Sequence, residues 1–131
     1  MWLRTLSIAL GGALGALARF ALSGWINSFS YMDSGRPGAV FPWGTLAVNL
    51  AGCLGIGLLA GIFHRRVVAP ELRALLLIGF LGGFTTFSTF ALESLELVRG
   101  GSTGLALANA LGSPLLGLAG VWLGDALSRL L

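Results

Sequence analysis

The chain has 131 residues, of which 56% are hydrophobic and 10% are charged, and its mean hydropathy is +0.90. So little charge would not keep a folded domain dispersed in water, so the composition excludes an ordinary soluble protein and indicates a membrane protein. The net charge of +3 reflects eight arginines and no lysine, and the arginines are scattered between apolar runs rather than gathered into a patch for nucleic acid.

Four hydrophobic runs predict transmembrane helices, at roughly residues 3–25, 43–63, 72–95 and 105–131. Each run has about 20 residues or more, which is enough to cross a bilayer core as a helix. The connectors at 33–38, 64–66 and 99–102 collect glycine, proline and charged residues. We therefore expect an all-α membrane protein that forms a single transmembrane domain over residues 1–131.

The arginines also bear on the orientation of the chain. With four spans, both termini and the middle connector lie on one side of the membrane. The arginines on that side are Arg4, Arg65, Arg66, Arg73 and Arg129, and those on the other side are Arg36 and Arg99. This bias favours termini in the cytoplasm, and insertion in both orientations stays open.

Glycines recur four residues apart along the predicted helices, a spacing that lets helix backbones approach closely in lipid. The pairs are Gly11/Gly15, Gly57/Gly61, Gly79/Gly83 and Gly120/Gly124. They predict close packing and a homo-oligomer, since a bundle of this size has little interior for a solvated pathway.

Polar side chains at membrane depth are costly and therefore mark candidate functional sites. Arg19 lies well along the first span, where it either reaches the nearer headgroups or serves a site. Asn49 lies about two turns inside the second span, where it either joins helices or faces a pathway. Thr45 lies four residues before Asn49 on the same helix face, so the two predict a short polar stripe.

The third span contains GGFTTFSTF, residues 82–90, which combines two glycines, four hydroxyl side chains and three phenylalanines. Consecutive glycines weaken a helix, and Thr or Ser can redirect backbone hydrogen bonds. We therefore expect the third helix to be broken in mid-membrane near residues 82–86. Irregular backbone in a membrane has to be buried in protein or line a cavity, and free carbonyls at such a break can hold a monovalent cation.

The phenylalanines of this segment are Phe84, Phe87 and Phe90, three residues apart. They serve either ordinary packing or, because Ser88 and Thr89 are interleaved with them, a polar pathway. An aromatic ring has a positive edge, and hydroxyl and amide groups donate hydrogen bonds. Ring edges and neutral donors together predict a weakly attractive path for a small anion, one that admits the ion without trapping it.

Three segments resemble the single-file fluoride channels, the Fluc or CrcB family: GGALGALARF, PWGTLAVNLAG and GFLGGFTTFSTF. The resemblance extends over essentially the whole chain, and the third segment is the most specific. It implies a fluoride-specific channel that lowers cytoplasmic fluoride by passive export, as a multi-pass protein of the cell inner membrane. It also implies an antiparallel, dual-topology homodimer with two fluoride pores and a structural sodium ion at the dimer interface.

The resemblance also assigns residues to the fluoride pathway. These residues are Asn49, Phe87, Phe90, Thr45, Ser88, Thr89 and Ser113. Asn49 matches the pore asparagine, and Phe87 and Phe90 match the fluoride-facing phenylalanines. The threonines of this set and Ser88 match the polar track of the family, and Ser113 matches a pore serine of the fourth span.

Two further matches concern the cation and the fourth span. The backbone carbonyls that hold sodium in the family fall on Gly82 and Thr85. One turn before the pore serine the family often has a tyrosine, whereas this sequence has Asn109 there, and Pro114 directly follows Ser113. The fourth span therefore departs from the family pattern.

Other classes of function fit the residues less well. A small four-helix multidrug-type exporter would need an acidic residue deep in a helix, whereas Glu93, Glu96 and Asp125 lie toward the ends of the predicted spans. An enzyme is not expected, because His64 is the only histidine and the single Cys53 provides neither a disulfide framework nor a zinc site. An assembly subunit of a larger membrane complex is a third alternative.

Overall fold

The computed structural model describes residues 1–31 and 40–131, and within them every regular element is helical. α1 covers Trp2–Tyr31, α2 covers Trp43–Arg65 and α6 covers Thr103–Ser128. The third span consists of consecutive segments: α3 (Pro70–Arg73), the π-helical η1 (Ala74–Phe80), α4 (Leu81–Phe84) and α5 (Phe87–Arg99). The all-α prediction is confirmed for this part of the chain.

Four helical stretches of the described chain are long and apolar enough to cross a membrane: Trp2–Phe29, Trp43–Arg65, Pro70–Arg99 and Thr103–Ser128. This confirms the expectation of four spans. The third helix begins two residues before the predicted hydrophobic run, at Pro70, because the fixed φ of proline suits a first helical position. The last helix ends at Ser128, before the predicted limit of residue 131.

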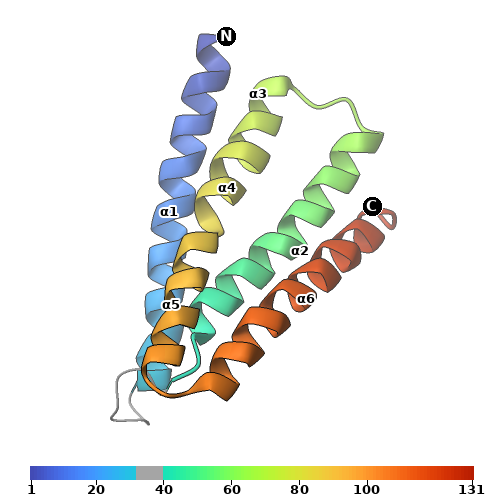
Figure 1. Ribbon diagram of the computed structural model, residues 1–131. Coiled ribbons are helices and arrows are strands. Elements are labelled where there is room, and N and C mark those ends of the chain that lie inside the picture. Colours follow the sequence, from blue (N-terminus) through green and yellow to red (C-terminus); the bar gives the residue numbers. More distant parts are fainter. Residues whose placement is uncertain (32–39) are drawn as a thin grey trace.

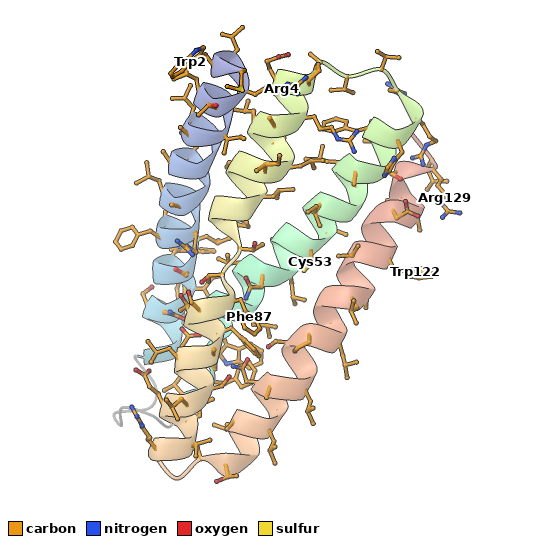
Figure 2. The ribbon with its side chains drawn as sticks, turned by 45° about the horizontal axis from the view of Figure 1, so that its top comes forward. Trp2, Arg4, Cys53, Phe87, Trp122 and Arg129 are labelled. Carbon is orange, nitrogen blue, oxygen red and sulfur yellow. The ribbon has the colours of Figure 1, made fainter. Side chains whose placement is uncertain are left out.

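The helices pack as two pairs, α1 against the third span and α2 against α6 (Figure 1). Both termini and the connector from α2 to α3 lie at one end of the bundle, and the turn from α5 to α6 lies at the other. Arg4 and Arg129 lie at the end that holds the termini (Figure 2). Arg65 at the end of α2 donates to the carbonyl and to the hydroxyl of Ser128, which ties the ends of α2 and α6 together. Arg36 lies outside the described residues.

The glycine pairs serve packing inside one subunit. Gly11 and Gly15 of α1 face the third span, and a Cβ on either would collide with a backbone carbonyl there. A Cβ on Gly124 of α6 would likewise collide with the carbonyl of Leu54 in α2. The predicted close packing is confirmed, but these pairs do not support the expected homo-oligomer, because their contacts are made within the chain.

Two local motifs set the helix ends nearest the site. Asn27 of α1 accepts a hydrogen bond from the Gly44 N–H at 3.0 Å, which satisfies one of the free donors at the start of α2. α5 ends in a Schellman motif, in which Gly101 has φ 79° and the Ser102 N–H donates to the Leu97 carbonyl at 2.8 Å. The motif turns the chain so that α6 runs back beside α5.

Candidate functional site

The third span leaves the helical conformation between α4 and α5. Thr85 has φ −79° and ψ 155°, and Thr86 has φ −146° and ψ 118°, so both residues are extended. Thr86 is also the N-cap of α5, since its Oγ1 accepts a hydrogen bond from the Thr89 N–H. A threonine at this position satisfies one of the donors that a helix start leaves free.

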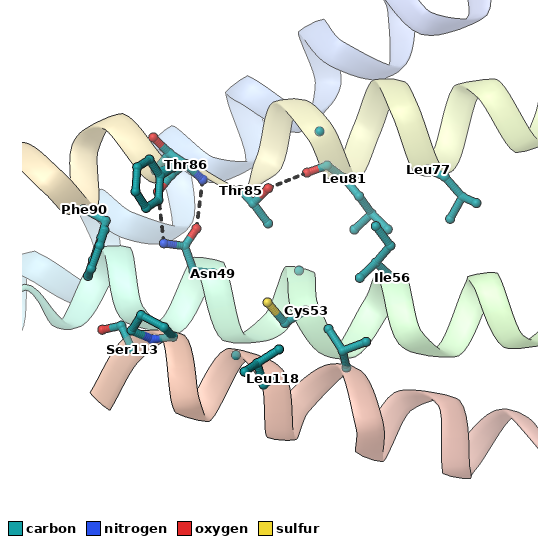
Figure 3. A pocket seen from close by; sticks show the side chains of 16 residues that line it. Asn49, Cys53, Ile56, Leu77, Leu81, Thr85, Thr86, Phe90, Ser113 and Leu118 are labelled. Carbon is teal, nitrogen blue, oxygen red and sulfur yellow. Dashed lines mark hydrogen bonds between the residues drawn. The ribbon is translucent and has the colours of Figure 1, made fainter. Parts of the chain in front are cut away.

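The amide of Asn49 is bound to the backbone of Thr86 on both sides (Figure 3). Its Nδ2 donates to the Thr86 carbonyl at 3.1 Å, and its Oδ1 accepts from the Thr86 N–H at 2.8 Å. Thr86 is buried, so water would not readily replace these bonds. The Asn49 side chain thus replaces the helical hydrogen bonds that Thr86 loses because Thr85 and Thr86 are extended.

These bonds leave carbonyls without their helical donors. In a continuous helix the Thr86 N–H would donate to Gly82, and the Thr89 N–H would donate to Thr85. Instead the first N–H is bound to Asn49 and the second to the Thr86 hydroxyl. The carbonyls of Gly82 and Thr85, on which the family resemblance places the sodium ligands, therefore lack these helical donors.

A cavity of about 570 Å³ lies between α2, the third span and α6 (Figure 3). The predicted site residues in its wall are Asn49, Phe87, Phe90, Ser113, Gly82 and Thr85. Most of the remaining wall is apolar, with side chains such as Ile56, Leu77, Leu118 and Val121. The cavity thus brings an amide, a hydroxyl and two aromatic rings together in surroundings that are otherwise poor in polar groups.

The phenylalanines of the third span separate into two environments. The rings of Phe87 and Phe90 lie 5.6 Å apart, tilted by 40° to each other, at the cavity, and Phe87 is 79% exposed. Phe84 is only 8% exposed and stacks on Phe80, with ring centroids 5.7 Å apart. Phe84 therefore belongs to the core, whereas Phe87 and Phe90 are free to act at the cavity.

A second cavity of about 270 Å³ lies on the other side of Thr86, between α1, α2 and α5. Its polar wall includes Thr45, Thr89 and the half-buried Arg19. Among the described residues, the Arg19 guanidinium has no hydrogen-bond or ion-pair partner. Thr86 lines both cavities, while Ser88 is exposed and belongs to neither lining. Of the predicted polar track, Thr45 and Thr89 therefore line the smaller cavity, and Ser88 lines neither cavity.

Sequence reasoning missed Glu93, which it placed toward the end of a span. Its carboxylate accepts a hydrogen bond from the Thr45 hydroxyl at 2.8 Å, and its second oxygen, Oε2, is buried without a partner. Glu93 lies four residues after Thr89, so a helical plot would have placed it on the same face. Thr86 was also missed, although a threonine directly before a helical run is a sequence signal for an N-cap.

On α6 the structure joins Ser113 to Asn109. The Ser113 hydroxyl donates to Asn109 Oδ1 at 2.7 Å, and Asn109 Nδ2 donates to the Ser94 hydroxyl of α5 at 2.9 Å. Asn109 is 1% exposed, so the position where the family often has a tyrosine is a buried link between two helices.

No cluster of three or more His, Cys, Asp or Glu side chains suited to a metal ion occurs within residues 1–31 and 40–131.

The fold defines a multi-pass helical membrane protein with two partly polar cavities between its spans. Over residues 6–125 the chain matches the family described as CrcB-like protein, Camphor Resistance (CrcB). The chain belongs to this family.

Relatives at 46 to 48% identity carry a functional name. A protein of Magnetococcus marinus named fluoride-specific ion channel FluC is 48% identical over 125 residues, which cover 95% of this chain and 96% of that protein. A protein of the same name from Solibacter usitatus is 46% identical over 128 residues, covering 97% and 99%. One from Thermus thermophilus is 46% identical over 121 residues, covering 92% and 90%.

Proposed function

We propose that this protein is a fluoride-specific ion channel that lets fluoride leave the cytoplasm passively. The observation that carries the proposal is the cavity that gathers Asn49, Phe87, Phe90 and Ser113 from three parts of the fold. The names of the relatives support fluoride as the ion. A transport function of this kind requires no catalytic residues, in keeping with the expectation that the protein is not an enzyme.

The two cavities form successive parts of the proposed path. The smaller cavity, with the Arg19 guanidinium and the Thr89 hydroxyl, attracts the anion and replaces part of its hydration. The Thr45 hydroxyl lines the same cavity but donates to Glu93. Asn49 stands at the passage between the cavities, because it is bound to Thr86 and Thr86 lines both. Its amide nitrogen carries two hydrogens; one is used on the Thr86 carbonyl, which leaves the other for the ion.

Beyond Asn49 the proposed path continues along Phe87 and Phe90. Their rings offer positive edges without a fixed charge, so the ion is held weakly and can leave again. A larger or more strongly hydrated path would lose selectivity, and a fixed cation at this point would trap the ion. The mostly apolar wall keeps the ring electrostatics from being screened by water.

The proposed channel is an antiparallel homodimer. The support within one subunit is the exposed ring of Phe87, which would be covered by a second copy across the cavity. The extended step at Thr85 and Thr86 then lies in mid-membrane, and a sodium ion is held at the interface by the carbonyls of Gly82 and Thr85. When bound, sodium supplies the positive charge that compensates carbonyls left without donors in a medium of low polarity.

The proposed location is the cell inner membrane. External acidity loads cells with HF, which dissociates in the cytoplasm, and the membrane potential, negative inside, then drives the anion out through a passive channel. Each elementary charge gains about 2.3 kcal/mol per 100 mV of potential. No coupled energy source is needed for such passive export.

The deciding experiment is fluoride efflux from liposomes that contain only this protein, measured with a fluoride electrode. Chloride efflux from the same liposomes is the control. We expect rapid fluoride release with little chloride release. Liposomes that release no fluoride, or that release both anions equally, would refute the proposed function.

A further inference from the structure

Four groups in and behind the wall of the larger cavity form one chain of hydrogen bonds, and all the donors in this chain point the same way. Ser113 donates to Asn109, Asn109 donates to Ser94, and the Ser94 hydroxyl donates to the Phe90 carbonyl at 2.7 Å. Of these residues only Ser113 and Phe90 line the cavity. Since every donor points away from the cavity, Ser113 presents only oxygen lone pairs to it, and an anion would be repelled.

Apart from Ser88, which pairs with the Thr86 hydroxyl, Ser113 differs from the other helical serines whose bonds are described. Ser7, Ser23, Ser28 and Ser94 each donate to a backbone carbonyl three or four residues earlier, which is the usual bond of a serine inside a helix. Ser113 donates instead to the Asn109 side chain. By accepting this bond, Asn109 keeps the Ser113 hydroxyl from donating to the backbone of α6. The hydroxyl hydrogen can therefore turn to another acceptor.

The chain can also run in the opposite direction, with the loss of one bond inside the protein. The oxygen and nitrogen of an amide are nearly equal in size, so a half-turn of the Asn109 amide fits the same space. Its nitrogen then donates to Ser113, its oxygen accepts from Ser94, and the Ser113 hydrogen points into the cavity. The Phe90 carbonyl keeps its backbone donor within α5, so the bond given up by Ser94 leaves no buried group unpaired.

We infer that Asn109 is a positioning residue that converts Ser113 from an acceptor to a donor when an anion reaches the cavity. The inference rests on the proposed function and extends it to a residue outside the cavity wall. The reversed chain has one bond fewer within the protein, and the bond from Ser113 to the anion replaces it. A strong acceptor such as fluoride makes a charge-assisted bond about twice as strong as a neutral one. A weaker acceptor gains less from the reversal, so the device favours fluoride.

The test compares fluoride efflux per folded protein for purified full-length variants in liposomes. Asn109→Asp keeps the size but, when ionised, only accepts hydrogen bonds, so Ser113 stays directed away from the cavity. Asn109→Leu removes the amide without adding charge, and Ser113 then turns to its own backbone. Each substitution should lower fluoride flux about tenfold, which corresponds to about 1.4 kcal/mol. Asn27→Asp is the matched control and should leave flux unchanged, since its oxygen still accepts from Gly44.

The decisive readout is coupling to Ser113. In a Ser113→Ala background, which should itself conduct about tenfold less, the uncharged Asn109→Leu change should not lower flux further, because Asn109 acts only through that hydroxyl. A loss that persists in the Ser113→Ala background would mean a structural or electrostatic role and would overturn the inference. So would wild-type flux in a folded Asn109 variant, or in Ser113→Ala. These outcomes leave a conducting wild-type protein, whereas a wild-type protein that releases no fluoride overturns the proposed function itself.

Discussion

Replacing Asn49 by alanine removes two things at once, the two hydrogen bonds to the Thr86 backbone and an amide donor in the wall of the larger cavity. Both hydrogen bonds to Thr86 are of ordinary length, 3.1 and 2.8 Å, and Thr86 is only 7% exposed. In membranes such bonds contribute about 0.6 to 1.7 kcal/mol each. The two together should therefore lower the free energy of unfolding by about 1 to 3 kcal/mol.

The effect on flux has a separate origin. The second Nδ2 hydrogen of Asn49 is the donor proposed to meet the ion, and a hydrogen bond to a charged group is worth about 1.5 to 3 kcal/mol. Its loss should lower fluoride flux by about tenfold or more. Stability is measured from thermal unfolding in detergent, followed by tryptophan fluorescence, and flux from fluoride efflux per folded protein.

Asn27→Ala provides the matched control for the Asn49 variant. Asn27 also binds backbone with its side chain, but it makes one such bond, to the Gly44 N–H at 3.0 Å, and it lies outside both cavity linings. We expect about half the loss of stability and wild-type flux. If Asn49→Ala lost stability but conducted normally, Asn49 would only join the helices. If its stability were unchanged, the reasoning about the Thr86 clamp would be wrong.

Phe87→Ile and Phe90→Ile should each reduce fluoride flux severalfold, since the edge of one ring contributes about 0.5 to 1.5 kcal/mol. Phe84→Ile is the control and should lower the unfolding temperature with little effect on flux per folded protein. Equal flux losses at all three positions would mean that the rings serve packing. Exhaustive replacement of sodium by a large organic cation should suppress fluoride flux and shift the protein from the proposed dimer toward monomer in size-exclusion chromatography. Full flux after this exchange would show that the proposed sodium ion is not required. Gly124→Ala should prevent α6 from packing on α2, because its Cβ would lie 2.7 Å from the Leu58 nitrogen. The control Gly112→Ala should fold normally, because its Cβ would meet no atom within 4 Å. A stable Gly124→Ala protein would contradict the packing described.

The sequence determined the number of spans, their lengths and the all-helical class, because hydrophobic run length alone decides what can cross a bilayer. It also drew attention to residues 82–86 as unsuited to continuous helix, of which Thr85 and Thr86 are extended, whereas Gly82 and Gly83 remain helical in α4. The family was recognisable from the segment GFLGGFTTFSTF, because a short motif of such unusual composition rarely occurs by chance. These properties are local, so they can be derived without the partners of each residue.

Only the tertiary structure decided which way the side chains face. Phe84 and Phe87 are three residues apart and would share a side in a continuous helix. The two extended residues between α4 and α5 change the helical phase, so Phe84 is buried while Phe87 is exposed at the cavity. The clamp of Asn49 on Thr86 and the link from Asn109 to Ser94 join residues 37 and 15 positions apart. Such bonds depend on how one helix is rotated against another, and that rotation is set by packing of the whole bundle rather than by any single span.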